Sequence, residues 1–392
     1  MEAVDNIEST FSSSSSSRLD DDADVRAEAA LIRASINILD DKLDVLDEAI
    51  DACMMRADSL RPWVLCGTAD AASFRSIHRF EFAEARRWQQ WARPHHRRTS
   101  GPFSVIYGYC LDGLAAREQL DLEAAEVSLR HAMQLATSRG EDSDYSSLLT
   151  GALLGELLYE QGKLDEAERL LDQSYRLGAE GGTVDFMLAT FATGARLKFW
   201  MGRRNDAVER LDQGERLAKA LRLPRLAAHI TNERIRTGIG IADMSPAKFP
   251  PGLPSRLPDG ITQVTAEITE ESAIRLLLGS KSRHASVQAY ERAHALATSI
   301  DPQLRPRASL NARLLLAECL AATDSPGEAE HTFLPLLEQC ARANLVQPIL
   351  DVGPHVRALV RRLDEARNTH DLNPRTAHHL DQIMTLQGTA QP

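Results

Sequence analysis

The chain has few of the residues that cross-link secreted domains. Its 392 residues include five cysteines, an odd number scattered over the whole length: Cys53, Cys66, Cys110, Cys319 and Cys340. No two have the short spacing of metal ligands, so we expect buried, reduced thiols in a cytoplasmic protein. The chain also lacks any apolar run near the ~18 residues of a membrane helix. Acidic residues follow Met1 where a signal peptide would be basic and then apolar. We therefore expect no membrane partner.

Aromatic residues are also scarce, at 5% of the chain, whereas alanine, leucine and arginine are abundant. This composition favours helices. The formal net charge is −11, and acidic and basic residues alternate along the expected helix faces. Such alternation is typical of a solvated surface and not of a basic nucleic-acid footprint. We expect no direct nucleic-acid binding.

What the chain does have is a repeat. Seven alanines recur at steps of 36, 40, 42, 40, 82 and 40 residues, the fifth step being about twice the others. They are Ala49, Ala85, Ala125, Ala167, Ala207, Ala289 and Ala329. A period near 40 residues is typical of stacked helical hairpins. Such a solenoid offers a binding surface rather than a catalytic centre.

The sequence around these alanines explains the period. The clearest copy is Lys163–Leu171, with the letters KLDEAERLL. Acidic residues suit the first turn of a helix, a small alanine fits where two helices cross closely, and large apolar residues then recur at helical spacing. We predict an all-α fold, an α-solenoid built as a tetratricopeptide-like superhelix of about eight helical hairpins.

Four regions are expected along the chain. They are a partial repeat and Ser-rich linker over 1–24, a helical repeat array over 25–240, a Pro-rich loop over 241–265, and C-terminal helical repeats with a polar tail over 266–392. The alanine-marked helix is missing near position 248, where Met244–Pro258 contains five prolines, and proline at that density cannot be helix interior. Helices should resume near Glu270. At the other end, the apolar stripe Ala3, Val4, Ile7 and Phe11 predicts a second helix that docks on a preceding segment.

Three stretches of the array resemble known proteins. Leu157–Glu168 resembles the tetratricopeptide-like region of the MalT-type, ATP-dependent LuxR-family transcriptional regulators. Ser174–Phe186 and Leu223–Ile239 resemble the C-terminal sensor region of bacterial serine/threonine protein kinase K. The resemblance covers most of residues 20–345. It implies a preceding kinase or ATPase domain and, by analogy with MalT, a role in recognising an inducer.

Neither partner domain is recognisable in the sequence. Gly162-Lys163 has no glycine five residues earlier and no following Ser or Thr, so it is not a phosphate-binding P-loop. After Leu363 there is no second pair of helices of the kind that reads DNA. We therefore expect the sensor part alone, whether it is a natural protein or a fragment.

The sequence offers no catalytic constellation. The pairs His95-His96 and His378-His379 have no evident third ligand, so we expect no metal, and we expect no other cofactor. No arrangement makes a nucleophile plausible, and we expect the chain not to be an enzyme, although the parent protein can carry a Ser/Thr kinase or ATPase domain. The basic, aromatic segment 86–98 could stack on bases. The spacing of Trp88 and Trp91 with Phe82 and Ala85 instead favours core tryptophans.

In tetratricopeptide arrays the first helix of each hairpin lines the concave surface. This places Tyr107–Glu118, Leu153–Tyr159 and Leu188–Trp200 on the working face. Our candidate binding residues are Tyr107, Tyr109, Glu156, Tyr159, Arg196, Trp200, Asn232 and Arg234. For the polar cluster at 232–236, ordinary ion pairs along the helix face are the other interpretation, and the one we weigh more heavily.

The function that this indicates is a non-catalytic regulatory sensor or scaffold module of a bacterial signal-transduction or transcription-regulatory protein. It would bind a small-molecule effector or a protein partner and relay that event to a fused or associated kinase or ATPase segment. The alternative is a transcriptional regulator of the LuxR/MalT type whose DNA-binding and ATPase parts are absent from this chain.

Overall fold

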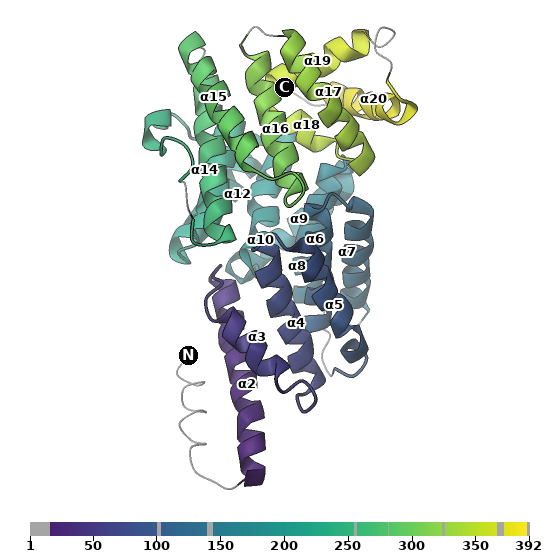
Figure 1. Cartoon of the computed structure of the whole chain (residues 1–392). Coiled ribbons are helices and arrows are strands. Elements are labelled where there is room, and N and C mark those ends of the chain that lie inside the picture. Colours follow the sequence, from purple (N-terminus) through teal and green to yellow (C-terminus); the bar gives the residue numbers. More distant parts are fainter. Residues whose placement is uncertain are drawn as a thin grey trace.

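Helical hairpins stacked side by side make up the molecule (Figure 1). The structure, a computed structural model, describes residues 16–99, 103–138, 144–254, 257–280, 282–323, 326–366 and 372–389. Within these ranges every regular element is a helix, and none of these helices is long and apolar enough to cross a membrane. The expected stripe at Ala3 to Phe11 lies outside the described residues.

The first four hairpins follow one another directly. They are α2 (Ser16–Leu39) with α3 (Leu46–Met54), α4 (Pro62–Ile77) with α5 (Phe82–His96), α6 (Phe103–Glu118) with α7 (Leu122–Thr137), and α8 (Asp144–Glu160) with α9 (Leu164–Ser174). After the short helix η2 (Tyr175–Glu180), three segments form the first helix of the next hairpin: α10 (Val184–Met187), the π-helical η3 (Leu188–Thr193) and α11 (Gly194–Trp200). Its second helix is α12 (Arg204–Ala220).

The second half is less regular. A lone helix α13 (Pro224–Thr237) precedes η4 (Pro246–Lys248), α14 (Gly260–Gly279) pairs with α15 (Arg283–Ser299), and α16 (Pro306–Ala321) pairs with α17 (Pro326–Ala343). The short α18 (Gln347–Val352), α19 (Pro354–Glu365) and α20 (Pro374–Thr389) follow. An all-α solenoid of tetratricopeptide-like repeats is thereby confirmed.

The periodic alanines lie where the period predicted. All seven are on second helices, namely α3, α5, α7, α9, α12, α15 and α17, and each is at most 2% exposed. The first helix comes equally close: a Cβ added to Gly155 of α8 would lie 2.9 Å from Cγ of Leu171 on α9. A small residue is required because two backbones approach here without room for a larger side chain.

The proline-rich segment replaces one second helix. Gly238 ends α13 in the left-handed conformation, and the chain then runs without a long helix until Gly260. Helix α14 thus begins earlier than the predicted resumption near Glu270, because Asp259 caps it by accepting a hydrogen bond from the Thr262 amide at 2.7 Å. Helix α2 likewise begins at Ser16 and not at Val25.

The array curls back on itself. Helix α16 contacts α6 and α18 contacts α8, as the green and yellow helices above the blue ones indicate in Figure 1. The backbone amide of Val346 donates to the carbonyl of Glu160 at 2.8 Å, and Arg307 pairs with Glu118 at 3.0 Å. The chain's own C-terminal helices therefore contact the inner face of the array.

Candidate functional site: a charged cavity

Closure of the array leaves a cavity of about 250 Å³ among the first helices. Its lining comes from the end of α4, the start of α5, the end of α15, and α6, α8, α10, η3, α11, α13, α14, α16 and α18, together with adjoining turns. The ionisable residues of the lining are His78, Arg117, Glu118, Glu156, Glu160, Asp185, Arg196, Arg225, His229, Glu233, Arg236, Glu267, Glu271, Arg275, Arg305, Arg307 and Asp351. So dense a set of charges inside a helical array is unusual, since buried charges are costly unless they are paired.

Most of these charges are paired between neighbouring repeats. Arg117 of α6 donates to both carboxylate oxygens of Glu160 on α8, at 2.6 and 3.0 Å. Arg305 binds both oxygens of Glu267 at 2.6 Å in the same two-pronged way. Arg225 joins Asp185, one repeat earlier, at 2.8 Å. Two parallel hydrogen bonds hold each guanidinium in a fixed plane, so these pairs lock the first helices to one another.

The pairing shifts the pKa values of the acids. Burial by itself would raise the pKa of Glu160, but the guanidinium groups of Arg117 and Arg307 outweigh it and lower the pKa to about 2. Burial likewise opposes ionisation of Glu233, and Arg196 and Arg236 overcome it and lower that pKa to about 2. Both carboxylates are therefore ionised at neutral pH.

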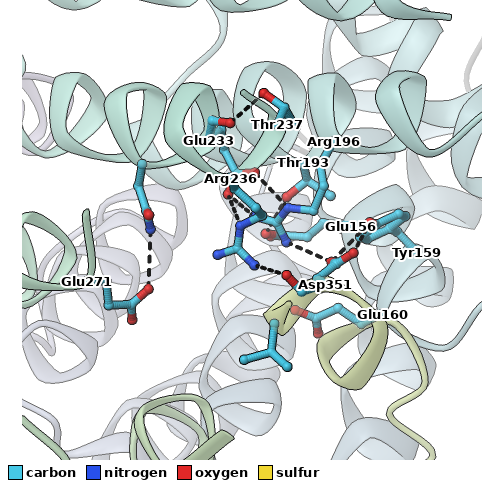
Figure 2. Close-up of polar contacts among 12 residues, drawn as sticks. Glu156, Tyr159, Glu160, Thr193, Arg196, Glu233, Arg236, Thr237, Glu271 and Asp351 are labelled. Carbon is cyan, nitrogen blue, oxygen red and sulfur yellow. Dashed lines mark hydrogen bonds and ion pairs between the residues drawn. The ribbon is translucent and has the colours of Figure 1, made fainter. Parts of the chain in front are cut away.

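Helix α18 borders the cavity and is joined to the array by the hydrogen bonds among Tyr159, Arg196, Glu233 and Asp351 (Figure 2). We call this group of hydrogen bonds the polar knot. The hydroxyl of Tyr159 lies 3.0 Å from both oxygens of Asp351, and Arg196 approaches the same carboxylate at 3.3 Å. Arg196 also binds Glu233 of α13. Burial raises the pKa of Asp351. Four helices, α8, α11, α13 and α18, thus meet at one group of hydrogen bonds.

A π-helical turn lies beside this knot. Residues Leu188–Thr193 carry it between α10 and α11, and Thr193 at its end donates to Glu156 of α8 at 3.0 Å. A π turn inserts one extra residue and rotates the side chains that follow it, and it occurs frequently at functional sites. Arg196 follows three residues later.

Three predicted residues line the cavity: Glu156, Arg196 and Asn232. A fourth, Tyr159, is fully buried and reaches the cavity wall through Asp351. These four residues come from α8, α11 and α13, which are first helices. They lie together at the cavity, as a working face built from first helices would require.

The other four predicted residues lie elsewhere. Tyr107 packs on Phe186, with ring centroids 5.2 Å apart. Tyr109 packs on two histidines, His96 and His131. Trp200 lines a separate surface pocket with Lys163 and Leu386. Arg234 pairs with Asp212 at 2.6 Å and Glu215 at 2.7 Å, because it lies on a different face of α13 from Asn232. The contacts of Arg234 are therefore ordinary ion pairs with these two acids.

The two tryptophans of α5 are only half-buried. Trp88 and Trp91 contact each other edge to face at 5.8 Å and pack against the core. Gln89 is the buried residue between them, and it donates to the hydroxyl of Ser73 at 2.9 Å. The helix is rotated so that a polar residue, and not an indole ring, faces the neighbouring helix.

The acids and arginines that dominate the lining were not among the predicted residues, for example Arg117, Glu160, Glu233, Glu267 and Arg305. A signal for them exists in the chain. Arg117 and Glu160 are 43 residues apart, and Glu267 and Arg305 are 38 apart. Opposite charges separated by about one repeat, both on first helices, predict an ion pair between adjacent repeats.

No group of three His, Cys, Asp or Glu side chains in the described parts of the chain is arranged to hold a metal ion. The five cysteines are free and buried. Burial raises the pKa of Cys66, Cys110 and Cys340 to about 12. Thiols this far from ionisation are poor nucleophiles.

Fold and site together define a closed helical-repeat module with an ionic interior. Residues 68–366 match the family model of the MalT-like TPR region. The chain belongs to this family.

The curated relatives that match are kinases by name. The serine/threonine-protein kinases PknK of Mycobacterium tuberculosis (strain H37Rv) and of Mycobacterium bovis are each 42% identical over 335 residues. The match covers 84% of this chain and 30% of each relative, so the chain spans less than a third of their length. Among solved structures, a "circular tandem repeat protein with novel repeat topology and enhanced subunit contact surfaces" covers 99% of this chain and 90% of its own at 13% identity. Its TM-score is 0.14, which is too low to bear on the fold.

Proposed function

We propose that this chain is the regulatory sensor or scaffold module of a bacterial signalling protein. It binds an effector or a protein partner and relays that event to a kinase or ATPase segment that is fused to it or associated with it. It works in the cytoplasm and performs no catalysis itself. Its membership of the MalT-like family and its likeness to PknK support this function.

One observation carries the proposal: the first helices of the array meet α18 at the polar knot around Asp351. A ligand that entered the cavity, or a partner that moved α18, would compete with these same hydrogen bonds. A binding event would therefore shift the balance between a closed and a more open array. A two-state element biased by ligand contacts is what regulation requires.

A chimera tests the proposal. The region of M. tuberculosis PknK that matches this chain is replaced by the chain, and autophosphorylation is compared for the native sequence and for Asp351→Ala. We expect Asp351→Ala to change the phosphorylation rate several-fold, since it loosens α18 from α8 and α11. As a control, Asp165→Ala on the exposed start of α9 should leave the rate unchanged. Equal rates for all three chimeras would overturn the proposal.

The alternative is a LuxR/MalT-type transcriptional regulator as the parent protein. The match to the family model of the MalT-like TPR region fits a parent of this type as well as it fits a kinase parent. It predicts that Asp351→Ala leaves the kinase chimera unaffected but alters reporter transcription when the chain replaces the matching region of a MalT-type regulator.

A further inference from the structure

Among the described residues, two arginines of the cavity make no hydrogen bond to a carboxylate, whereas the other five do. Arg117, Arg196, Arg225, Arg305 and Arg307 each make at least two hydrogen bonds to carboxylate oxygens. Arg275 instead donates only to a backbone carbonyl, that of Val352, at 2.8 Å. Arg236 donates to the carbonyl of Asp351 at 3.2 Å and approaches Glu233 at 3.4 Å without forming a hydrogen bond to it.

The two under-paired guanidinium groups lie close together. Arg236 on α13 and Arg275 on α14 bind consecutive carbonyls at the end of α18. The Nε atom of each is buried and makes no hydrogen bond to the described residues, although that of Arg236 lies within ion-pair distance of Glu233. Burial, and then the nearby Arg236, lowers the pKa of Arg275 to about 10. The hydrogen-bonding capacity of these two guanidinium groups is therefore not filled by carboxylates of the described residues.

Further unsatisfied atoms lie on the same stripe of α13. Asn232 is 2% exposed, and its amide nitrogen donates to Glu271 at 3.2 Å, while its Oδ1 has no partner among the described residues. His229, one turn earlier, also lines the cavity with an unpartnered Nε2. Burial, and then Arg225, lowers the pKa of His229 to about 3, so its ring is neutral. Buried polar atoms without partners are rare and indicate a missing ligand or ordered water.

We propose that the cavity binds a small monocarboxylate, whose carboxylate group lies between the guanidinium groups of Arg236 and Arg275. This inference rests on the sensor function proposed above and names the chemical class of its effector. A planar carboxylate matches the fork of a guanidinium. The volume of about 250 Å³ is many times the space that one water needs, so an organic acid of a few carbon atoms fits.

The charges around the site favour a singly charged ligand. Three arginines, Arg196, Arg236 and Arg275, face three acids, Glu233, Glu271 and Asp351. Because this local set is already balanced, a phosphate dianion would add two negative charges beside three carboxylates. One added charge, placed against the under-paired arginines, is the smaller electrostatic cost.

The rival explanation is structural. Cations near the last carbonyls of a helix stabilise its C-terminus, so Arg236 and Arg275 could serve only to hold α18. That role requires one N–H group from each guanidinium and leaves the unpartnered Nε atom of Arg275 without an explanation.

The test uses the full chain, sodium acetate and sodium pyruvate as probes, and sodium chloride and sodium phosphate at equal ionic strength for comparison. Melting temperature and calorimetric binding are measured for the native chain, Arg275→Gln and Arg275→Lys. Arg283→Gln, at the exposed start of α15, is the matched control. We expect a saturable rise in melting temperature with the carboxylates only. Binding should fall about tenfold or more in Arg275→Gln, as expected when a charge-assisted hydrogen bond is lost. The control should bind like the native chain.

Two other outcomes would each overturn the inference. Saturable stabilisation by phosphate and not by acetate or pyruvate would overturn the carboxylate class. No anion effect, together with a lower melting temperature for Arg275→Gln and recovery in Arg275→Lys, would show that the arginine only holds α18. In that case the inference fails, whereas the regulatory function stands or falls with the kinase chimera.

Discussion

At the scale of single residues, Glu160 connects the most parts of the closed array. Its carboxylate binds Arg117 from the preceding repeat and Arg307 from α16, and its carbonyl accepts from Val346. Glu160→Gln leaves two buried guanidinium groups under-paired. We expect a loss of about 3 to 5 kcal/mol in the free energy of unfolding, measured by urea denaturation.

A control for this variant is available on the surface. Glu166 of α9 pairs with Arg130 at 3.1 Å, and both side chains are more than a third exposed. Glu166→Gln should cost about 0 to 1 kcal/mol. Equal losses for the two variants would mean that the interior ion pairs do not hold the array together.

Acid should destabilise the protein for the same reason. The folded-state pKa values of Glu160 and Glu233 are about 2, below the usual 4.5. Between these values the unfolded chain binds more protons than the folded one, so the unfolding free energy rises with pH. The contribution is complete above about pH 5 and is lost as the pH falls toward 2. Melting temperatures from pH 2 to 6 should show this slope, and Glu160→Gln should flatten it. A native curve that is flat over this range would contradict the assignment.

At the scale of the element, the second helices depend on their small residue. Ala207 of α12 is fully buried, whereas Ala220 at the end of the same helix is exposed. We expect Ala207→Leu to destabilise the protein by about 1 to 3 kcal/mol through overpacking. Ala220→Leu should change stability by less than about 0.5 kcal/mol. Thermal unfolding compares the two, and similar melting temperatures would show that the helices do not pack as closely as the repeat requires.

The repeat explains how far the sequence could predict the fold. The alanine period follows from a local requirement, a small side chain at each helix crossing. The period therefore located the second helix of each hairpin. It also led to the prediction that first helices carry the site, and Glu156 and Arg196 of that prediction line the cavity. Ala207 on α12 and Ala289 on α15 mark the last second helix before the interruption and the first one after it, and the prolines between them explain why one second helix is missing.

The contacts that close the array could not be predicted in this way. Tyr159 and Asp351 are 192 residues apart, and no repeat unit contains both of them. Their contact depends on the accumulated curvature of the intervening hairpins, to which each interhelical angle adds a small amount. Arg234 was misplaced for a simpler reason. Two residues along a helix turn a side chain by about 200°, so Asn232 and Arg234 face different neighbours.

At the scale of the whole molecule, the loop at 244–254 should be the most accessible described segment to proteases, since apart from η4 it has no regular structure. Limited trypsin digestion should cut there first, at Lys248. We expect the two pieces to stay together on gel filtration, because α13 packs on α14 and α16 on α6 across the break. First cuts within the hairpins, or separation of the pieces without denaturant, would contradict this arrangement.

The closure at Asp351 and Arg307 also has a consequence for how the chain folds. An open repeat array grows from any nucleus by adding neighbours, so its contacts stay local and it folds quickly. Here the pairs Arg307–Glu118 and Tyr159–Asp351 join residues 189 and 192 positions apart. The loop entropy of such contacts is lost before their energy is gained. Refolding should therefore show a fast phase, in which hairpins form and stack, and a slower one in which the two halves meet. Asp351→Ala should abolish the slow phase and leave the fast one unchanged.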